Sequence, residues 1–134
     1  MAHDPHALSE EILEFLAERH LSTLTVLRPD GSPHVTPVGF TWDNHAGLAR
    51  IITWAGARKV HHLSWPTGGS LPRASVCQVD GGRWLTLEGH AVVTTDPERC
   101  AVGEQLYAQR YRPPKVRDDR RVIEITVDRV LGRA

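Results

Sequence analysis

Apolar and polar residues alternate with a period of two along most of this chain, which is the spacing of β-strands. Turns rich in glycine, proline and aspartate separate the alternating runs. The pattern predicts six strands, at residues 21–28, 34–42, 48–53, 74–79, 83–94 and 122–130. The first two form an expected hairpin, because Pro29, Asp30 and Gly31 between them favour a tight turn.

Three segments carry helical signals instead. Residues 10–20 follow Ser9, a good N-cap, and place their apolar side chains on one face. A short helix is expected at residues 57–63. A third helix runs from Asp96, a cap residue followed by proline, to about Tyr111. Short antiparallel strands with few helices predict a mostly β protein with flanking helices, folded as a small or half-open barrel.

The length of 134 residues predicts one domain, with residues 1–8 expected to be flexible. Acidic and basic residues balance at 16 each, which argues against non-specific binding of nucleic acid or membrane. The sequence shows no apolar run approaching 18 residues and no signal-peptide pattern. Cys77 and Cys100 lack metal-like spacing, so we expect buried, reduced thiols in a cytoplasmic protein.

The stretch from Ile52 to Lys59 has the composition of an anion site. A hydroxyl at Thr53, a turn at Gly56, a helix start and two cations, Arg58 and Lys59, fall within seven residues. Free N–H groups at a helix start favour an anion. Arginine adds a planar fork and lysine a point charge. The stretch predicts a phosphate site, and the alternative is a solvated basic pair on a surface turn.

Other candidate contacts lie elsewhere in the chain. Pro37 cannot donate a ladder hydrogen bond, so we expect it at an edge or bulge, where backbone faces a ligand. A second basic group forms either a carboxylate-binding rim or a solvated loop; its members are Arg110, Tyr111, Arg112, Lys115, Arg117, Arg120 and Arg121. Trp84 is either a core residue or a pocket aromatic.

Motifs for metal binding and for nucleophilic catalysis are missing from the sequence. Adjacent His61 and His62 point about 100° apart on a helix, so we expect no metal site. The sequence contains neither a nucleophile elbow nor a Gly-rich dinucleotide fingerprint. The remaining features suit a large anionic cofactor that carries the reaction itself. His34 is the first side chain to test for acid–base chemistry.

Several runs of residues resemble one family. They are residues 31–34 (Gly-Ser-Pro-His), 52–59, 78–89, 107–112 and 129–132. The chain resembles the pyridoxamine phosphate oxidase-like split-barrel proteins, which use flavin or deazaflavin. Within them it is most similar to the coenzyme F420-dependent branch and its deazaflavin-dependent biliverdin reductases. The likeness spans residues 8–132, although the loop at residues 65–73 is longer than usual and Ala57 stands where a hydroxyl residue is common.

The resemblance implies a six-stranded antiparallel split β-barrel of the FMN-binding type. It also implies a homodimer with two cofactor sites at the interface. The phosphate contacts would be Thr53, Arg58 and Lys59. The ring contacts would be Thr36, Pro37, Val38, Gly39 and Trp84, with Tyr111 from the second chain. Substrate carboxylates would meet Arg110, Arg112 and Arg117.

The expected activity is hydride transfer from reduced F420 to a conjugated acceptor that bears carboxylates, with biliverdin favoured. An FMN-dependent oxidase acting on pyridoxamine phosphate or a related small molecule is the first alternative. The second is a protein that carries deazaflavin, flavin or haem without turnover.

Overall fold

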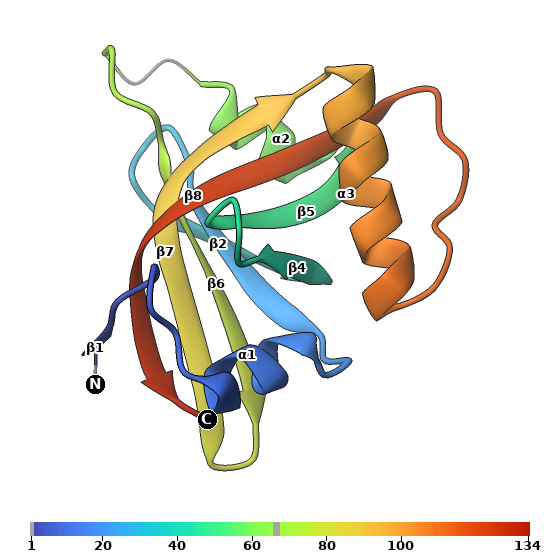
Figure 1. Cartoon of the computed structure of the whole chain (residues 1–134). Coiled ribbons are helices and arrows are strands. Elements are labelled where there is room, and N and C mark those ends of the chain that lie inside the picture. Colours follow the sequence, from blue (N-terminus) through green and yellow to red (C-terminus); the bar gives the residue numbers. More distant parts are fainter. Residues whose placement is uncertain (1, 66–67) are drawn as a thin grey trace.

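The computed structural model describes residues 2–65 and 68–134. Strands are its main regular structure, and three helices flank them (Figure 1). In chain order the elements of this described part are β1 (Ala2–His3), α1 (Glu10–Ala17), β2 (Ser22–Leu27), β3 (Pro33–Val38), β4 (Phe40–Asp43), β5 (Leu48–Trp54), α2 (Arg58–Leu63), β6 (Arg73–Asp80), β7 (Arg83–Thr94), α3 (Pro97–Arg110) and β8 (Arg120–Arg133).

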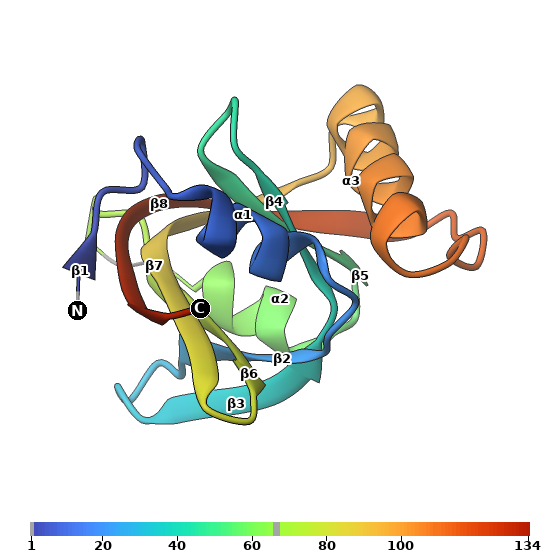
Figure 2. The same cartoon turned by 60° about the horizontal axis from the view of Figure 1, so that its bottom comes forward.

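All strand pairs are antiparallel, and their order is β3-β2-β6-β7-β8-β5-β4, with β1 added to the end of β8. The sheet curls into a half-open barrel (Figure 2). Helix α1 covers one end of this barrel and α2 the other, whereas α3 lies outside against β4, β5 and β8. The prediction of a mostly β split barrel with flanking helices is confirmed.

The prediction of one continuous strand at residues 34–42 is wrong. β3 ends at Val38 and β4 begins at Phe40, although the two strands lie at opposite ends of the strand order. The chain therefore passes from one sheet edge to the other at Gly39. The rings of Tyr107 and Tyr111 lie over this residue, and a Cβ added there would be 3.1 Å from their atoms. A glycine permits this close approach.

Element ends differ from prediction where side chains make tertiary contacts. Helix α1 ends at Ala17 and not at residue 20, because the chain turns at Glu18, whose carboxylate pairs with Arg83. The two predicted N-caps are confirmed: Ser9 accepts from the N–H of Ile12, and Asp96 from that of Arg99. The strand β1 has no predicted counterpart. It pairs with Val130 and Leu131 of β8, a strand that extends beyond its predicted end at residue 130.

The core fills the barrel between its two helical ends. Its largest fully buried apolar side chains are Phe15, Phe40, Leu24, Ile51, Leu85, Leu87, Ile123 and Ile125. Four consecutive β8 residues, 122–125, are buried because α3 covers the outer face of that strand. There Gly103 of α3 packs against Val122.

The outer face of β2, β3 and β6 has no cover in this chain. Leu21, Leu27, Val35 and Val79 are between 53% and 69% exposed there. Cys77 is half-buried on the same face, which differs from the predicted burial, whereas Cys100 is buried; both thiols are free. None of the helices in the described ranges is long and apolar enough to cross a membrane.

Gly89 offers a direct test of the sheet. It lies at the register shift between β7 and β8, where a Cβ would stand 1.9 Å from the Thr126 carbonyl oxygen. Because backbone blocks that space, we expect Gly89→Ala to lower the free energy of unfolding by about 3 kcal/mol or more. Urea denaturation measures the change. Gly82→Ala is the matched control, since its nearest atom is a side-chain nitrogen of Arg133 at 3.9 Å. Equal stability of the two variants would contradict the register.

Candidate functional site

Acidic side chains pair with one set of arginines and leave other cations without partners. Examples of such pairs are Arg50 with Asp43 and Arg120 with Glu104. Five cations that have no ion-pair partner among residues 2–65 and 68–134 gather at two places. They are Arg28, Arg58 and Lys59 at the first, and Arg112 and Lys115 at the second.

The first place is a corner between the β2–β3 turn, β3 and α2, which we call the histidine corner. It consists of Arg28, His34, Arg58, Lys59 and His62. The two imidazole rings meet edge to face, with their centroids 4.9 Å apart. His62 is buried, and the Nδ1 atoms of both histidines are buried without a hydrogen-bond partner in the described chain. The corner therefore combines three cations with two unpaired imidazole nitrogens.

Burial and nearby cations favour the neutral form of both imidazoles. Burial lowers the pKa of His34 below its usual 6.5, and the charges of Arg28, Lys59 and Arg58 lower it further. Burial also lowers the pKa of His62, with added effects from His34 and nearby cations. Burial lowers the pKa of Lys59 as well. The corner is thus a region where positive charge is concentrated and an anion is favoured.

Two predicted cofactor residues supply buried hydroxyls with no partner in the described chain. Thr53 is 1% exposed, and its Oγ1 has no hydrogen bond; the Oγ1 of Thr36 is in the same state. An unpaired buried hydroxyl costs about 1–3 kcal/mol, so such atoms commonly await a ligand or water. The residues present therefore fit a polar, anionic cofactor.

The second place is a cavity of about 410 Å³ between β5, α3 and the loop after α3, which we call the basic cavity. It is lined by Ile52, Thr53, Trp54, Tyr107, Arg112, Pro113, Pro114, Lys115, Arg117 and Arg120. Ion pairs hold part of its wall: Arg117 donates to Asp119 at 2.9 and 3.2 Å. The predicted contacts Thr53, Arg112 and Arg117 are thus brought together.

Trp54 connects the two places. Its ring lies 5.4 Å from the Lys59 ammonium and 5.1 Å from the Arg117 guanidinium carbon, so two cations flank one indole. Each contact is worth about 0.5–1 kcal/mol where solvent reaches it. Trp54 is 41% exposed, so part of its surface remains open to a ligand.

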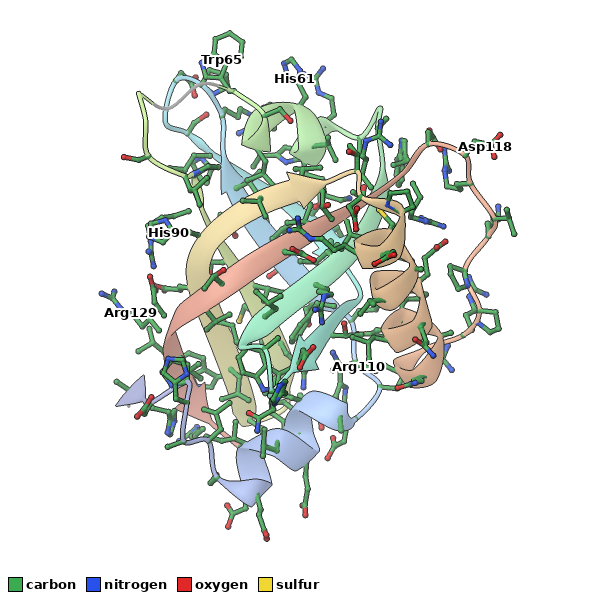
Figure 3. The ribbon with its side chains drawn as sticks, turned by 45° about the horizontal axis from the view of Figure 1, so that its top comes forward. His61, Trp65, His90, Arg110, Asp118 and Arg129 are labelled. Atoms are coloured by element: carbon green, nitrogen blue, oxygen red, sulfur yellow. The ribbon has the colours of Figure 1, made fainter. Side chains whose placement is uncertain are left out.

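Arg110 and Tyr111 lie apart from the basic cavity and brace the Gly39 crossing. Arg110 donates to the carbonyl oxygens of Glu18 at 2.9 Å and Phe40 at 2.5 Å, and to the Gln78 amide. The Tyr111 hydroxyl donates to the carbonyl of His20 at 2.6 Å. Figure 3 shows Arg110 at the end of α3, on the side that faces the barrel, and Asp118 far out on the following loop. Burial raises the pKa of Tyr111 and lowers that of Arg110.

The remaining predicted contacts lie elsewhere. Thr36, Pro37 and Val38 belong to β3, which ends the strand order, so Pro37 is confirmed at an edge. Trp84 begins β7 opposite Val79. The β6–β7 hairpin lies at the end of the barrel opposite α2 (Figure 1), so one copy of the chain does not bring Trp84 to the histidine corner.

One cluster of metal-ligand types occurs in the described ranges, outside these places. Single ligand atoms of Glu18, His20 and Asp80 lie within 4.8 Å of one another. Arg83 ion-pairs with both carboxylates, so an arginine already balances their charge.

Sequence reasoning assigned no role to several residues of these two places. Trp54 and Arg28 have no role predicted from sequence, Lys115 is predicted only as part of a possible carboxylate-binding rim, and His62 is considered only as a metal ligand. Adjacent His61 and His62 carry the one local signal, because a helix turns one outward and one inward. His61 is exposed and points away from the barrel beside Trp65 (Figure 3), and His62 is buried.

A split barrel that gathers unpaired cations beside unpaired buried hydroxyls defines a protein that binds an anionic ligand. The sequence model of the pyridoxamine 5′-phosphate oxidase family matches residues 8–134. The chain belongs to this family.

Similar proteins include an F420H2-dependent biliverdin reductase of Mycobacterium tuberculosis. It is 47% identical over 127 residues, which are 95% of this chain and 89% of that protein. Among solved structures, a conserved hypothetical protein of M. tuberculosis superposes with a TM-score of 0.76 at 25% identity, over 94% of this chain and 84% of the other. A structure described as an F420 reductase superposes with a TM-score of 0.72 at 21% identity, over 92% and 98%.

The neutral histidine pair predicts how stability depends on pH. Since the folded chain holds both pKa values below 6.5, the unfolded chain takes up these protons first as pH falls. The free energy of unfolding should therefore decrease as pH falls below 6.5 and be independent of this pair at higher pH. Urea denaturation between pH 8 and 5 measures it. The His34→Gln/His62→Gln double variant should flatten the slope, and His45→Gln, in an exposed turn, should keep it.

Proposed function

We propose that this protein is an F420-dependent reductase that transfers a hydride from reduced deazaflavin to a conjugated acceptor bearing carboxylates, with biliverdin as the favoured acceptor. The 47% identity to an F420H2-dependent biliverdin reductase over 95% of this chain carries the proposal. Two groups of unpaired cations support it, because both the cofactor phosphate and the acceptor carboxylates need positive partners. Its two free cysteines suit a reducing, cytoplasmic location.

The proposed cofactor contacts follow from the unpaired groups. Arg58 and Lys59 meet the phosphate, the Thr53 hydroxyl takes a further hydrogen bond, and the edge backbone of residues 36–39 lies along the ring system. When bound, reduced F420 supplies the hydride. The protein's own part is to orient the acceptor and to balance its charge. Since Trp84 is remote from α2 within one chain, we place it in the site of a second copy.

The proposed acceptor site is the basic cavity. Arg112 and Lys115 have no ion-pair partner and meet the two propionates of a linear tetrapyrrole, with Arg117 beside them. Arg110 is left out of this clamp, because its donors are engaged by backbone and by Gln78. His34 is neutral at pH 7, so we assign no proton transfer to it and expect solvent or the substrate to supply the proton.

We further propose a homodimer. The uncovered apolar face of β2, β3 and β6 supports it, since such faces of single proteins commonly mark interaction sites. This face includes the edge strand β3, whose backbone is proposed to hold the cofactor. A second copy seated there would bring residues of both chains to one site.

Anaerobic oxidation of reduced F420 tests the function. We expect recovery of deazaflavin absorbance when biliverdin is added, and none with NADPH in place of the deazaflavin. The alternative is an FMN-dependent oxidase, which the family match favours and whose phosphate would suit the same cations. Tight binding of FMN without F420 binding would establish that alternative. F420 binding without any acceptor-dependent oxidation would reject biliverdin and favour a carrier.

Lys59 should contribute strongly to cofactor affinity. It is half-buried and has no ion-pair partner among the described residues, so a phosphate would be its counter-charge. Lys59→Ala should weaken F420 binding by about 1.5–3 kcal/mol, the value of a hydrogen bond to a charged group. Quenching of tryptophan fluorescence measures affinity. Arg19→Ala, an exposed cation outside both places, is the control, and equal affinity of the two variants would contradict the phosphate contact.

Arg112 should act on substrate binding. If its clamp holds the ground and transition states alike, Arg112→Ala raises the KM for biliverdin by about tenfold and leaves kcat nearly unchanged. Wild-type KM should rise with salt, because exposed charges are screened over about 8–10 Å at physiological ionic strength. Steady-state assays at several salt concentrations measure both. A fall in kcat at constant KM would argue against a clamp, and Arg19→Ala again serves as the control.

The dimer predicts a mass twice the 14.9 kDa of one chain. Val79→Asp places a charge in the uncovered face and should shift the equilibrium to monomer, because a charge cannot be buried there without a partner. Static light scattering at micromolar concentration measures the mass. Val102→Asp on α3 alters an exposed valine elsewhere, at 40% exposure against 60% for Val79, and should leave the dimer intact. A monomeric wild-type protein would reject this interface.

A further inference from the structure

We propose that His34 and His62 form a proton-linked anion site, in which binding of a phosphate-like group raises the pKa of the imidazole pair and takes up a proton. The proposed function has no role for these two histidines. The anion is either the cofactor phosphate or a free oxyanion of the same chemistry. The first of these sources rests on the proposed function.

The first support is the shortage of hydrogen-bond partners. The Nδ1 atoms of both histidines are buried with no partner in the described chain, and His62 is only 7% exposed. A buried polar group in this state is costly. An anion that accepts a hydrogen bond from an imidazolium would satisfy it.

The second support is uncompensated charge. Arg28, Arg58 and Lys59 act on His34, and none of the three has an ion-pair partner in the described ranges. Many acidic side chains of the chain form ion pairs with other arginines, as Asp43 does with Arg50. The carboxylate of Asp30 in the β2–β3 turn acts on Arg28 without forming an ion pair with it, so the positive charge of Arg58 and Lys59 in the corner is the less compensated.

The third support is access. His62 lines a cavity of about 300 Å³ that Arg28, Trp65 and Arg73 also border. Arg73 is already engaged by Asp128 at 2.7 Å and lies 3.3 Å from His90, so its charge is balanced. Arg28 donates to the backbone and the hydroxyl of the β2–β3 turn and keeps its net charge. An anion entering here meets Arg28 and His62, and the remaining cations of the corner act on the pair from α2.

The groups that face the imidazole pair determine the direction of the linkage. They are Arg28 of the turn, His34 of β3, Arg58, Lys59, His61 and His62 of α2, and Arg73 of β6 with its partners His90 and Asp128. Without an anion, the unpaired cations and burial favour the neutral pair. A bound anion offsets that repulsion, so protonation and anion binding favour one another by the same factor.

The pair should accept one proton and not two. Its ring centroids are 4.9 Å apart, so a second charge would meet strong repulsion and the two sites would titrate as a unit. Anion affinity should therefore rise as pH falls from 8 to 6, with uptake of about one proton at most. A purely structural histidine pair would not couple to an anion at all.

Sulfate is the sharpest probe, because its own charge is constant over this pH range. NMR titration of the histidine ring signals of the intact protein, with and without sulfate, measures the pKa values directly and requires no variant. We expect sulfate to raise the pKa of the pair. Calorimetry in buffers of different ionisation enthalpy should show proton uptake. Unchanged pKa values at saturating sulfate, or the absence of proton uptake, would overturn the proposal.

Variants locate the effect. His62→Gln keeps a polar side chain that does not titrate, and it should make sulfate affinity several-fold less dependent on pH. His34→Gln should do the same, and His45→Gln should behave as wild type. Equal pH dependence in wild type and both corner variants would refute the assignment.

Competition identifies the source of the anion. We expect F420 to displace sulfate and to raise the same histidine pKa values. If F420 binds but does not displace sulfate, the link between this site and the cofactor is refuted. If F420 binds normally but the histidines do not respond, the inference fails while the proposed function stands. If sulfate raises the histidine pKa values as expected but F420 does not bind at all, the proposed function fails while the anion site remains.

Discussion

The chain leaves one edge of its sheet and joins the other at Gly39, and the surrounding structure depends on this crossing. The rings of Tyr107 in α3 and of Tyr111 directly after it lie over the glycine. Arg110 donates to the carbonyls of Phe40 and of Glu18, the residue that follows α1, and to the Gln78 amide of β6. These bonds hold α3 against the barrel. The position of α3 in turn defines one wall of the basic cavity, so the shape of that cavity depends on the close approach at Gly39.

The local sequence pattern predicts the bounds of those elements whose contacts lie close in the chain. The strand β7 has the predicted bounds, 83–94, because alternation is strict and a Gly-Gly turn precedes it. The break at Gly39 was not predictable, since the rings that require it are nearly 70 residues away in the chain. For the same reason the sequence predicts a substrate contact for Arg110, whose partners Glu18, Phe40 and Gln78 are distant in the chain. Pairing with β1 and cover by α3, both long-range, made β8 longer and more buried than predicted.

Sequence predicts best those parts of the candidate site that consist of neighbouring residues. The basic turn at Arg58 and Lys59 and the basic loop around Arg112 were each visible as a run. What sequence did not reveal was which cations remain unpaired after folding, because the carboxylates that neutralise Arg50 and Arg120 come from distant positions. A chain with zero net charge thus acquires two local excesses of positive charge, with Trp54 between them.

The central place of β8 affects how the chain is made. It is the last strand in chain order, yet it pairs with β7, β5 and β1. Until β8 leaves the ribosome, the sheet exists only as two unjoined parts, β3-β2-β6-β7 and β5-β4. Non-local strand pairing is slow, and unpaired edges are prone to aggregate. Without β8, the edges of β7 and β5 that it joins are both unpaired, so the two parts of the sheet are held together only once the last strand has paired.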